Sequence, residues 1–111
     1  MEIKERSVNG VTILDLTGNL EIGVGDVQLR EKIRILINTG KKQILLNLAA
    51  VRRIDSSGLG ELVASYTTVT NNGGTLKLVS LPDRVRDILM ITQLITVFET
   101  YDIEQEAINS F

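Results

Sequence analysis

The sequence contains neither cysteine nor histidine, and only one proline and 4% aromatic residues. Without these side chains the chain offers no thiol nucleophile, no disulfide, no imidazole for acid–base catalysis and few zinc ligands. No apolar run approaches the roughly 20 residues that cross a bilayer as a helix. The charged start at residues 1–6 lacks the apolar stretch of a signal peptide. We therefore expect a cytoplasmic protein with no metal site, no cofactor and no membrane span.

Charge and length narrow the class further. The 12 basic and 14 acidic residues leave a formal net charge of −2 and are spread along the chain without a basic stripe. Direct binding to nucleic acid is therefore not expected. A chain of 111 residues with 43% hydrophobic content supports one compact core. We predict a single domain over residues 1–111.

The spacing of apolar residues predicts alternating strands and helices. Two β-rich runs, residues 3–8 and 11–17, flank Asn9-Gly10, which is a strong signal for a tight hairpin. The rest of the chain then alternates between helical and strand spacing. We predict helices at 27–38 and 57–71, from near 83 and from 102, and strands at 43–48, 75–79 and 97–101.

This order of elements predicts an α/β fold. Crossover connections make the later strands parallel, whereas the opening hairpin is antiparallel. The strand at 43–48 is apolar at nearly every position, as a central strand covered on both faces should be. We expect a mixed central sheet of about five strands with about four helices.

The segment Asp55-Ser56-Ser57-Gly58-Leu59-Gly60 is the most informative in the chain. It follows the predicted central strand and places both serines in the first turn of the next helix. Free backbone N–H groups and the helix dipole stabilise an anion there. In open α/β sheets, sites usually lie beyond the carboxyl ends of inner strands. A serine at this point could therefore be a phosphorylation switch.

The simpler interpretation of the same segment is a helix N-cap, because Asp and Ser are preferred at that position. A cap does not explain Gly58 and Gly60, since each glycine costs up to about 1 kcal/mol relative to alanine inside a helix. We therefore expect close approach to these glycines, either by another stretch of backbone or by a phosphate.

With Ile54 added, the segment from Ile54 to Gly60 resembles the signature of STAS-domain anti-sigma factor antagonists. The predicted order of elements is also that family's order, so the resemblance covers nearly the whole chain. Gly18-Asn19-Leu20-Glu21 resembles the family's turn after the second strand, and Gly73-Gly74-Thr75-Leu76 resembles its lead into the fourth. Glu21 stands where family members often have Asp, and residues 22–26 form a slightly longer segment than usual.

The resemblance implies a bacterial regulator of transcription that works by partner switching and is not an enzyme. Such a protein binds an anti-sigma factor, itself a serine kinase, and so frees a sigma factor. Phosphorylation of the serine directly after the aspartate, here Ser56, ends that binding, and a metal-dependent serine phosphatase restores it. The implied partner-binding residues are Asp55, Ser57, Gly58, Leu59, Gly60, Glu21 and Arg53. We infer that Asp55 orients the hydroxyl or helps to recruit the kinase's metal–nucleotide, and that both glycines let the partner approach at an exposed first turn.

Several alternatives stay open or are disfavoured. Arg52 and Arg53 either contact the partner's acids or the phosphoserine, or simply form a solvated loop.

Gly23-Val24-Gly25 resembles the start of a dinucleotide fingerprint, but Gln28 stands at the third glycine position, which favours a plain turn. A phosphoaspartate receiver would need an acidic pair where the first strand ends at residues 6–9, and none is present. A structural STAS scaffold in a stress-signalling or lipid-transport complex remains open.

Overall fold

The computed structural model describes residues 1–111 and contains one five-stranded sheet in the order β1-β2-β3-β4-β5. β1 pairs antiparallel with β2, and every later pair is parallel. These findings confirm the predicted mixed α/β sheet with an opening hairpin. In chain order, the elements are β1 (Glu2–Val8), β2 (Val11–Leu20), α1 (Asp26–Asn38), β3 (Gln43–Ile54), α2 (Ser56–Asn71), β4 (Thr75–Val79), α3 (Asp83–Ile91), the 3₁₀ turn η1 (Leu94–Thr96), β5 (Thr100–Tyr101) and α4 (Glu104–Asn109).

The hairpin turn forms at Asn9-Gly10, as predicted. Both residues have positive φ angles, 52° and 80°, and Val8 pairs with Val11 across the turn. Asparagine and glycine tolerate this left-handed conformation, which suits the twist of the two strands. The local sequence therefore fixes the register of the first pair.

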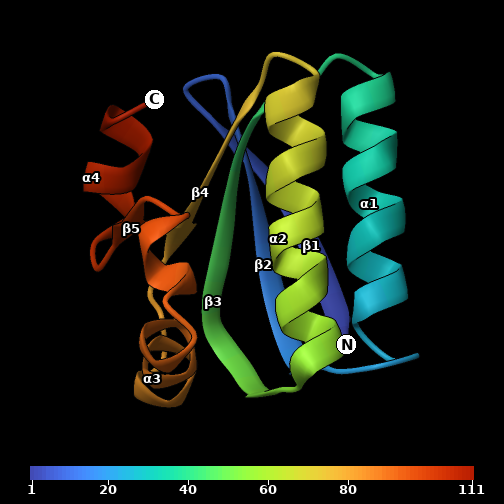
Figure 1. Ribbon diagram of the computed structural model, residues 1–111. Coiled ribbons are helices and arrows are strands. Elements are labelled where there is room, and N and C mark those ends of the chain that lie inside the picture. The colour runs from blue at the N-terminus through green and yellow to red at the C-terminus, as the bar shows by residue number, and fades with distance from the viewer.

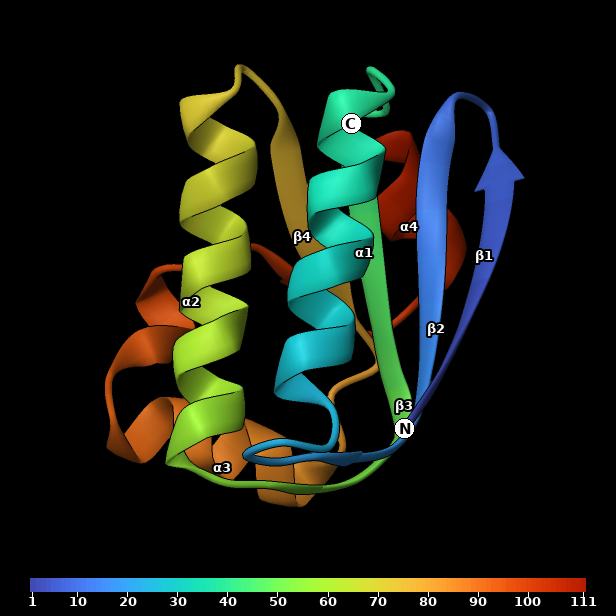
Figure 2. The same cartoon turned by 90° about the vertical axis from the view of Figure 1, so that its right-hand side faces the viewer.

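The sheet separates two layers of helices. α1 and α2 lie side by side on one face, and α4 lies on the other (Figures 1 and 2). Because side chains alternate along a strand, Leu14 and Leu46 belong to the larger apolar cluster with α1, α2 and α3, whereas Ile13 and Leu45 belong to a smaller cluster with α4. The central strands are thus covered on both faces, as their apolar composition predicts. None of the helices has the length and apolarity needed to cross a membrane.

The structure corrects four predicted boundaries. β2 continues to Leu20 and β3 to Ile54, beyond the predicted ends at residues 17 and 48, because the two parallel strands stay paired as far as Leu20 and Ile54. β5 covers only Thr100–Tyr101 instead of residues 97–101, since the 3₁₀ turn η1 intervenes after Gln93, whose φ is 63°. α4 begins at Glu104 rather than at residue 102.

The extension of β3 positions the candidate site. β2 and β3 are parallel, and their last residues, Leu20 and Ile54, are paired. The two chain segments that follow therefore leave the sheet side by side, at the carboxyl ends of these strands. One leads into the loop at residues 21–25, and the other leads directly into α2, both at the lower end of the domain in Figure 1.

Candidate functional site

Asp55 joins the start of α2 to the loop at residues 21–25. Its backbone N–H donates to the carbonyl oxygen of Leu20 (3.3 Å). One carboxylate oxygen accepts from the N–H of Gly58 at 2.8 Å, and the other accepts from the N–H of Ile22 at 3.0 Å. The first of these bonds is an N-cap, as the simpler interpretation of the sequence predicts. The second bond reaches a segment distant in the sequence.

These two amides also set the electrostatics of Asp55. The N–H groups of Ile22 and Gly58 hold the pKa of the Asp55 carboxyl below its ordinary value. Hydrogen bonds to a carboxylate favour its ionised form, so a negative charge is fixed at the positive end of α2. Asp55 is the only carboxylate that can stabilise this helix end in this way, because the first turn of α2 contains no acidic side chain.

The two serines differ in accessibility. Ser56 is the first residue of α2 and is exposed, whereas Ser57 is half-buried. The helical hydrogen bonds begin with the N–H of Leu59, which donates to the carbonyl oxygen of Asp55 at 2.9 Å. Of the two, Ser56 is therefore the hydroxyl that another protein reaches more freely.

The structure corrects the expected position of Gly58. This residue is buried, and a Cβ atom built on it would lie 2.0 Å from the carbonyl oxygen of Leu20. The expectation that Gly58 lies exposed and lets a partner approach is wrong, because the last carbonyl of β2 occupies that space. Close approach by another stretch of backbone, the other possibility raised by the sequence, is what the structure shows.

Gly60 and the neighbouring Leu59 differ in exposure. Gly60 is exposed, and no atom lies within 4 Å of a Cβ built on it. Nothing inside the chain therefore requires a glycine there. Leu59 is only 9% exposed and packs in the larger apolar cluster, so its side chain faces away from solvent.

The structure brings Glu21 and Arg53 together although they are far apart in sequence. The guanidinium of Arg53 lies 3.4 Å from the Glu21 carboxylate, with side chains 65% and 24% exposed. Their strands end side by side, which makes the pair a consequence of the β2–β3 register. A partly exposed pair of this kind contributes little to stability. The Arg53 guanidinium faces solvent beside the loop at residues 21–25, whereas the Glu21 side chain is half-buried.

That loop is built as a tight turn, and the sequence alone did not single out its exposed apolar residues. The N–H groups of Val24 and Gly25 both donate to the carbonyl oxygen of Glu21, at 3.1 and 3.2 Å. This turn places Ile22 and Val24 at the surface, where they are 70% and 47% exposed. The available signal was an isoleucine and a valine placed between glycines, outside any helix or strand pattern.

The site has no cleft. None of the three surface hollows of the molecule includes Asp55, Ser56 or Ser57 in its lining. Nor does the structure gather three or more His, Cys, Asp or Glu side chains that could hold a metal ion. An exposed serine beside apolar loop residues suits contact with another protein better than enclosure of a small substrate.

The fold and the site together define a small mixed α/β domain that presents a serine at the start of a helix. Residues 2–107 match the sequence model of the family described as the STAS domain. The chain belongs to this family.

Relatives and solved structures agree with this assignment. A Thermotoga neapolitana protein, provisionally named an anti-sigma factor antagonist, is 35% identical over 98 residues, which cover 86% of this chain and 87% of the relative. The anti-sigma-B factor antagonist of Bacillus subtilis is 33% identical over 81 residues, with coverage of 73% and 72%. A crystal structure of a provisionally named anti-sigma factor antagonist from Thermotoga maritima has a TM-score of 0.89 at 29% identity, with coverage of 97% and 92%. SpoIIAA in its unphosphorylated form has a TM-score of 0.75 at 22% identity, with coverage of 98% and 96%, and so shares the fold.

Proposed function

We propose that the chain is an anti-sigma factor antagonist whose binding is switched off by phosphorylation of Ser56. In this role it is a ligand and a phosphorylation substrate, with no turnover of its own. The partners are an anti-sigma factor with serine kinase activity and a metal-dependent serine phosphatase. The observation that carries the proposal is the exposed Ser56 hydroxyl at the first position of α2, beside an exposed apolar loop. The names of the relatives support the same role.

The geometry favours Ser56 over Ser57 as the acceptor. Ser56 is exposed, whereas Ser57 is half-buried. A phosphate adds about −1.5 to −2 charge at pH 7, and a helix N-terminus accepts such a charge without rearrangement. We therefore expect the free domain to keep its fold when it is phosphorylated.

Loss of binding then follows from desolvation in the complex. A phosphate pressed against a surface shaped for a neutral hydroxyl loses its hydration, and it adds to the charge of Asp55. A penalty of about 3 kcal/mol would weaken affinity by more than a hundredfold. In this proposal the added charge at Ser56 weakens binding directly, without a change in the fold of the domain.

The remaining residues take supporting or contact roles in this proposal. Ile22 and Gly60 offer an apolar side chain and a bare helix surface for contact. Arg53 offers an exposed charge at the rim, and Glu21 offers a half-buried one. Gly58 and Leu59 act indirectly, because both are buried and hold α2 against β2 and the core.

Intact mass measurement tests the proposal. The wild type, Ser56→Ala and Ser57→Ala are each incubated with the cognate kinase and ATP, and each protein is weighed. We expect one added phosphate on the wild type and on Ser57→Ala, and none on Ser56→Ala. A phosphate retained on Ser56→Ala but lost on Ser57→Ala would refute the assignment. In binding assays, Ser56→Asp should mimic the phosphorylated state, whereas Ser56→Ala should stay bound in the presence of kinase and ATP.

A further inference from the structure

Two asparagines of the chain are followed directly by glycine, in the pairs Asn9-Gly10 and Asn72-Gly73. Asparagine is a thermolabile residue, because the backbone nitrogen of the next residue can attack the carbon of its side-chain amide. A following glycine leaves this approach open, since it has no side chain. All four residues are exposed, so exposure does not distinguish the two pairs, whereas their hydrogen bonds do.

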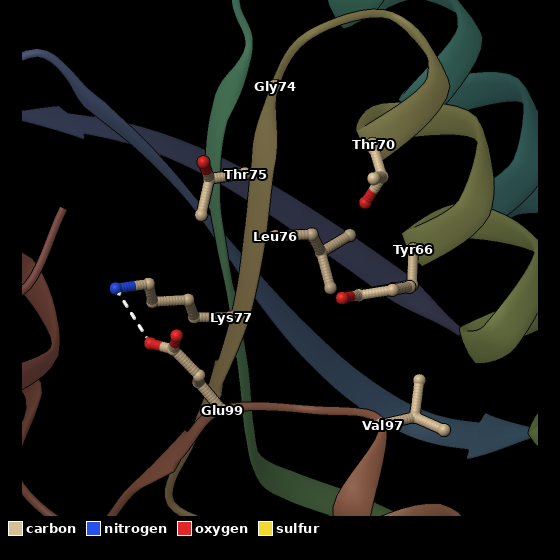
Figure 3. A pocket seen from close by; sticks show the side chains of 8 residues that line it. All are labelled: Tyr66, Thr70, Gly74, Thr75, Leu76, Lys77, Val97 and Glu99. Atoms are coloured by element: carbon tan, nitrogen blue, oxygen red, sulfur yellow. Dashed lines mark ion pairs between the residues drawn. The ribbon is translucent and has the colours of Figure 1, made fainter.

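Hydrogen bonds hold both reacting groups of the pair Asn72-Gly73 at the end of α2. The side-chain amide nitrogen of Asn72 donates to the carbonyl oxygen of Thr68 at 2.7 Å. The backbone N–H of Gly73 donates to the carbonyl oxygen of Thr70 at 3.0 Å, a kind of bond that satisfies the last carbonyl groups of a helix. Figure 3 shows this turn between Thr70 and Gly74. Attack by the Gly73 nitrogen would therefore break a bond at each reacting group.

The pair Asn9-Gly10 has neither of these restraints. The Asn9 side chain and the Gly10 N–H make no hydrogen bond, because the strand ladder ends at the pair Val8↔Val11 on either side of them. The turn lies at the upper right of the domain in Figure 2, at the end of the edge strand β1. Only this closing pair has to open before the turn can change conformation, and such ends open at little cost in free energy.

We propose that Asn9 is a site of spontaneous deamidation in the folded protein and that Asn72 is protected from the same reaction. The Gly10 nitrogen attacks Cγ of Asn9 and forms a C–N bond. The bond from Cγ to Nδ2 breaks, and ammonia leaves with the proton of the Gly10 N–H. Water then opens the resulting cyclic imide at one of its two carbonyl carbons. One opening gives aspartate, and the other gives isoaspartate, in which the main chain runs through the side-chain carbons.

Isoaspartate at this position weakens the hairpin, because it lengthens the backbone of the turn by one carbon atom. The pair Val8↔Val11 needs a two-residue connection of fixed geometry, which the longer backbone does not provide. Close to this pair, Arg6 of β1 contacts Asp15 at 2.7 Å and Glu104 of α4 at 2.6 Å. Loosening of the hairpin end therefore reaches a contact that holds α4 against the sheet. The reaction is a slow, covalent loss of stability that is independent of the proposed phosphorylation.

NMR spectra of the ¹⁵N-labelled full chain, recorded during incubation in mildly alkaline buffer, follow the two side-chain amides separately. In the folded protein we expect the Asn9 signal to disappear about tenfold faster than the Asn72 signal, or more. In urea, where neither site keeps its hydrogen bonds, the two rates should agree within about twofold. Freshly prepared Asn9→Asp is the matched control, because it has the normal aspartate product without isoaspartate. The aged wild type should therefore melt at a lower temperature than Asn9→Asp.

Several results would overturn the proposal. Loss of the Asn72 signal as fast as the Asn9 signal in the folded protein would show that the helix end gives no protection. Full retention of the Asn9 amide, over a time in which the unfolded chain loses it, would show that the hairpin turn itself blocks the attack. A rate difference of the same size in urea would assign the preference to the neighbouring sequence and not to the hydrogen bonds. Equal melting temperatures of the aged wild type and Asn9→Asp would contradict the weakening of the hairpin.

Discussion

The Asp55 carboxylate accepts a hydrogen bond of 3.0 Å from the backbone N–H of Ile22, and this bond fixes the loop at residues 21–25 against the start of α2. The same carboxylate caps the helix through Gly58. Asp55 therefore couples the exposed Ser56 to the exposed apolar side chain of Ile22. A partner that contacts both meets one preorganised surface rather than two independent loops.

Two substitutions of Asp55 should distinguish the contributions of its two hydrogen bonds. In Asp55→Asn the remaining carbonyl oxygen can still cap the N–H of Gly58, but the amide nitrogen cannot accept from Ile22. In Asp55→Ala both bonds are lost. We expect a fall of several degrees in melting temperature for Asp55→Ala and a smaller fall for Asp55→Asn.

Hydrogen exchange distinguishes the two losses. The Ile22 amide should exchange faster in both variants, whereas the Gly58 amide should do so only in Asp55→Ala. Unchanged protection of the Ile22 amide in Asp55→Asn would show that the loop is held by other contacts.

Acid should destabilise the fold through carboxylates whose pKa values are lowered. Hydrogen bonds from Arg6, above all, lower the pKa of Asp15, and the bond from Asn47 adds to this effect. A lowered pKa contributes stability that is fully present above the unfolded value, near 4, and is lost as the pH falls through the folded value. Other carboxyl groups with lowered pKa values are Glu5, Asp55 and Glu99.

We therefore expect the free energy of unfolding to change little above about pH 5 and to fall steadily below about pH 4. Asp15→Asn should be less stable than the wild type at neutral pH, and the difference should shrink in acid. Urea titrations between neutral pH and pH 2.5 measure both trends. A difference that stays constant with pH would mean that Asp15 contributes through packing instead of charge.

Gly58 and Gly60 form a matched pair for a test of stability. The Cβ of Gly58→Ala would meet the Leu20 carbonyl at 2.0 Å, which requires the backbone to shift, and we expect a loss of about 1–3 kcal/mol. Gly60→Ala meets nothing within 4 Å and removes a flexible residue from a helix. It should gain about 0.5–1 kcal/mol. Denaturant unfolding measures both, and equal effects at the two positions would contradict the assigned close approach.

Gly58 also shows which feature of the site the sequence alone could not predict. Two glycines in a helical pattern indicate that something comes close, but the sequence does not say whether it is this chain or a partner. The answer depends on the register that places Leu20 opposite Ile54. Glu21 and Arg53 meet for the same reason, which is a tertiary relationship with no local signal. By contrast, the Asn9-Gly10 turn and the cap at Asp55 are local, and both were predictable.

The shortened β5 has a similar cause. Val97 and Phe98 are typical strand residues, but Phe98 is buried with its ring against Tyr66, at 5.4 Å between centroids and 78° between planes. This packing follows a turn in which Gln93 adopts a positive φ of 63°. Burial of an aromatic side chain therefore overrides the local strand propensity of residues 97–99.

Ile22 provides a direct test of the contact surface. Its side chain is 70% exposed, so Ile22→Ser should leave the melting temperature nearly unchanged. If the anti-sigma factor covers this side chain, the variant loses about 1.5–3 kcal/mol of apolar burial, which is roughly a tenfold to hundredfold loss of affinity. Ile103→Ser is the matched control, because Ile103 is also exposed, at 56%, and lies at the N-cap of α4 on the other face of the sheet. Calorimetric titration with the anti-sigma factor compares the two variants. Equal affinities for Ile22→Ser and Ile103→Ser would show that the loop at residues 21–25 lies outside the contact, and the partner surface would then be confined to the exposed face of α2 around Ser56 and Gly60.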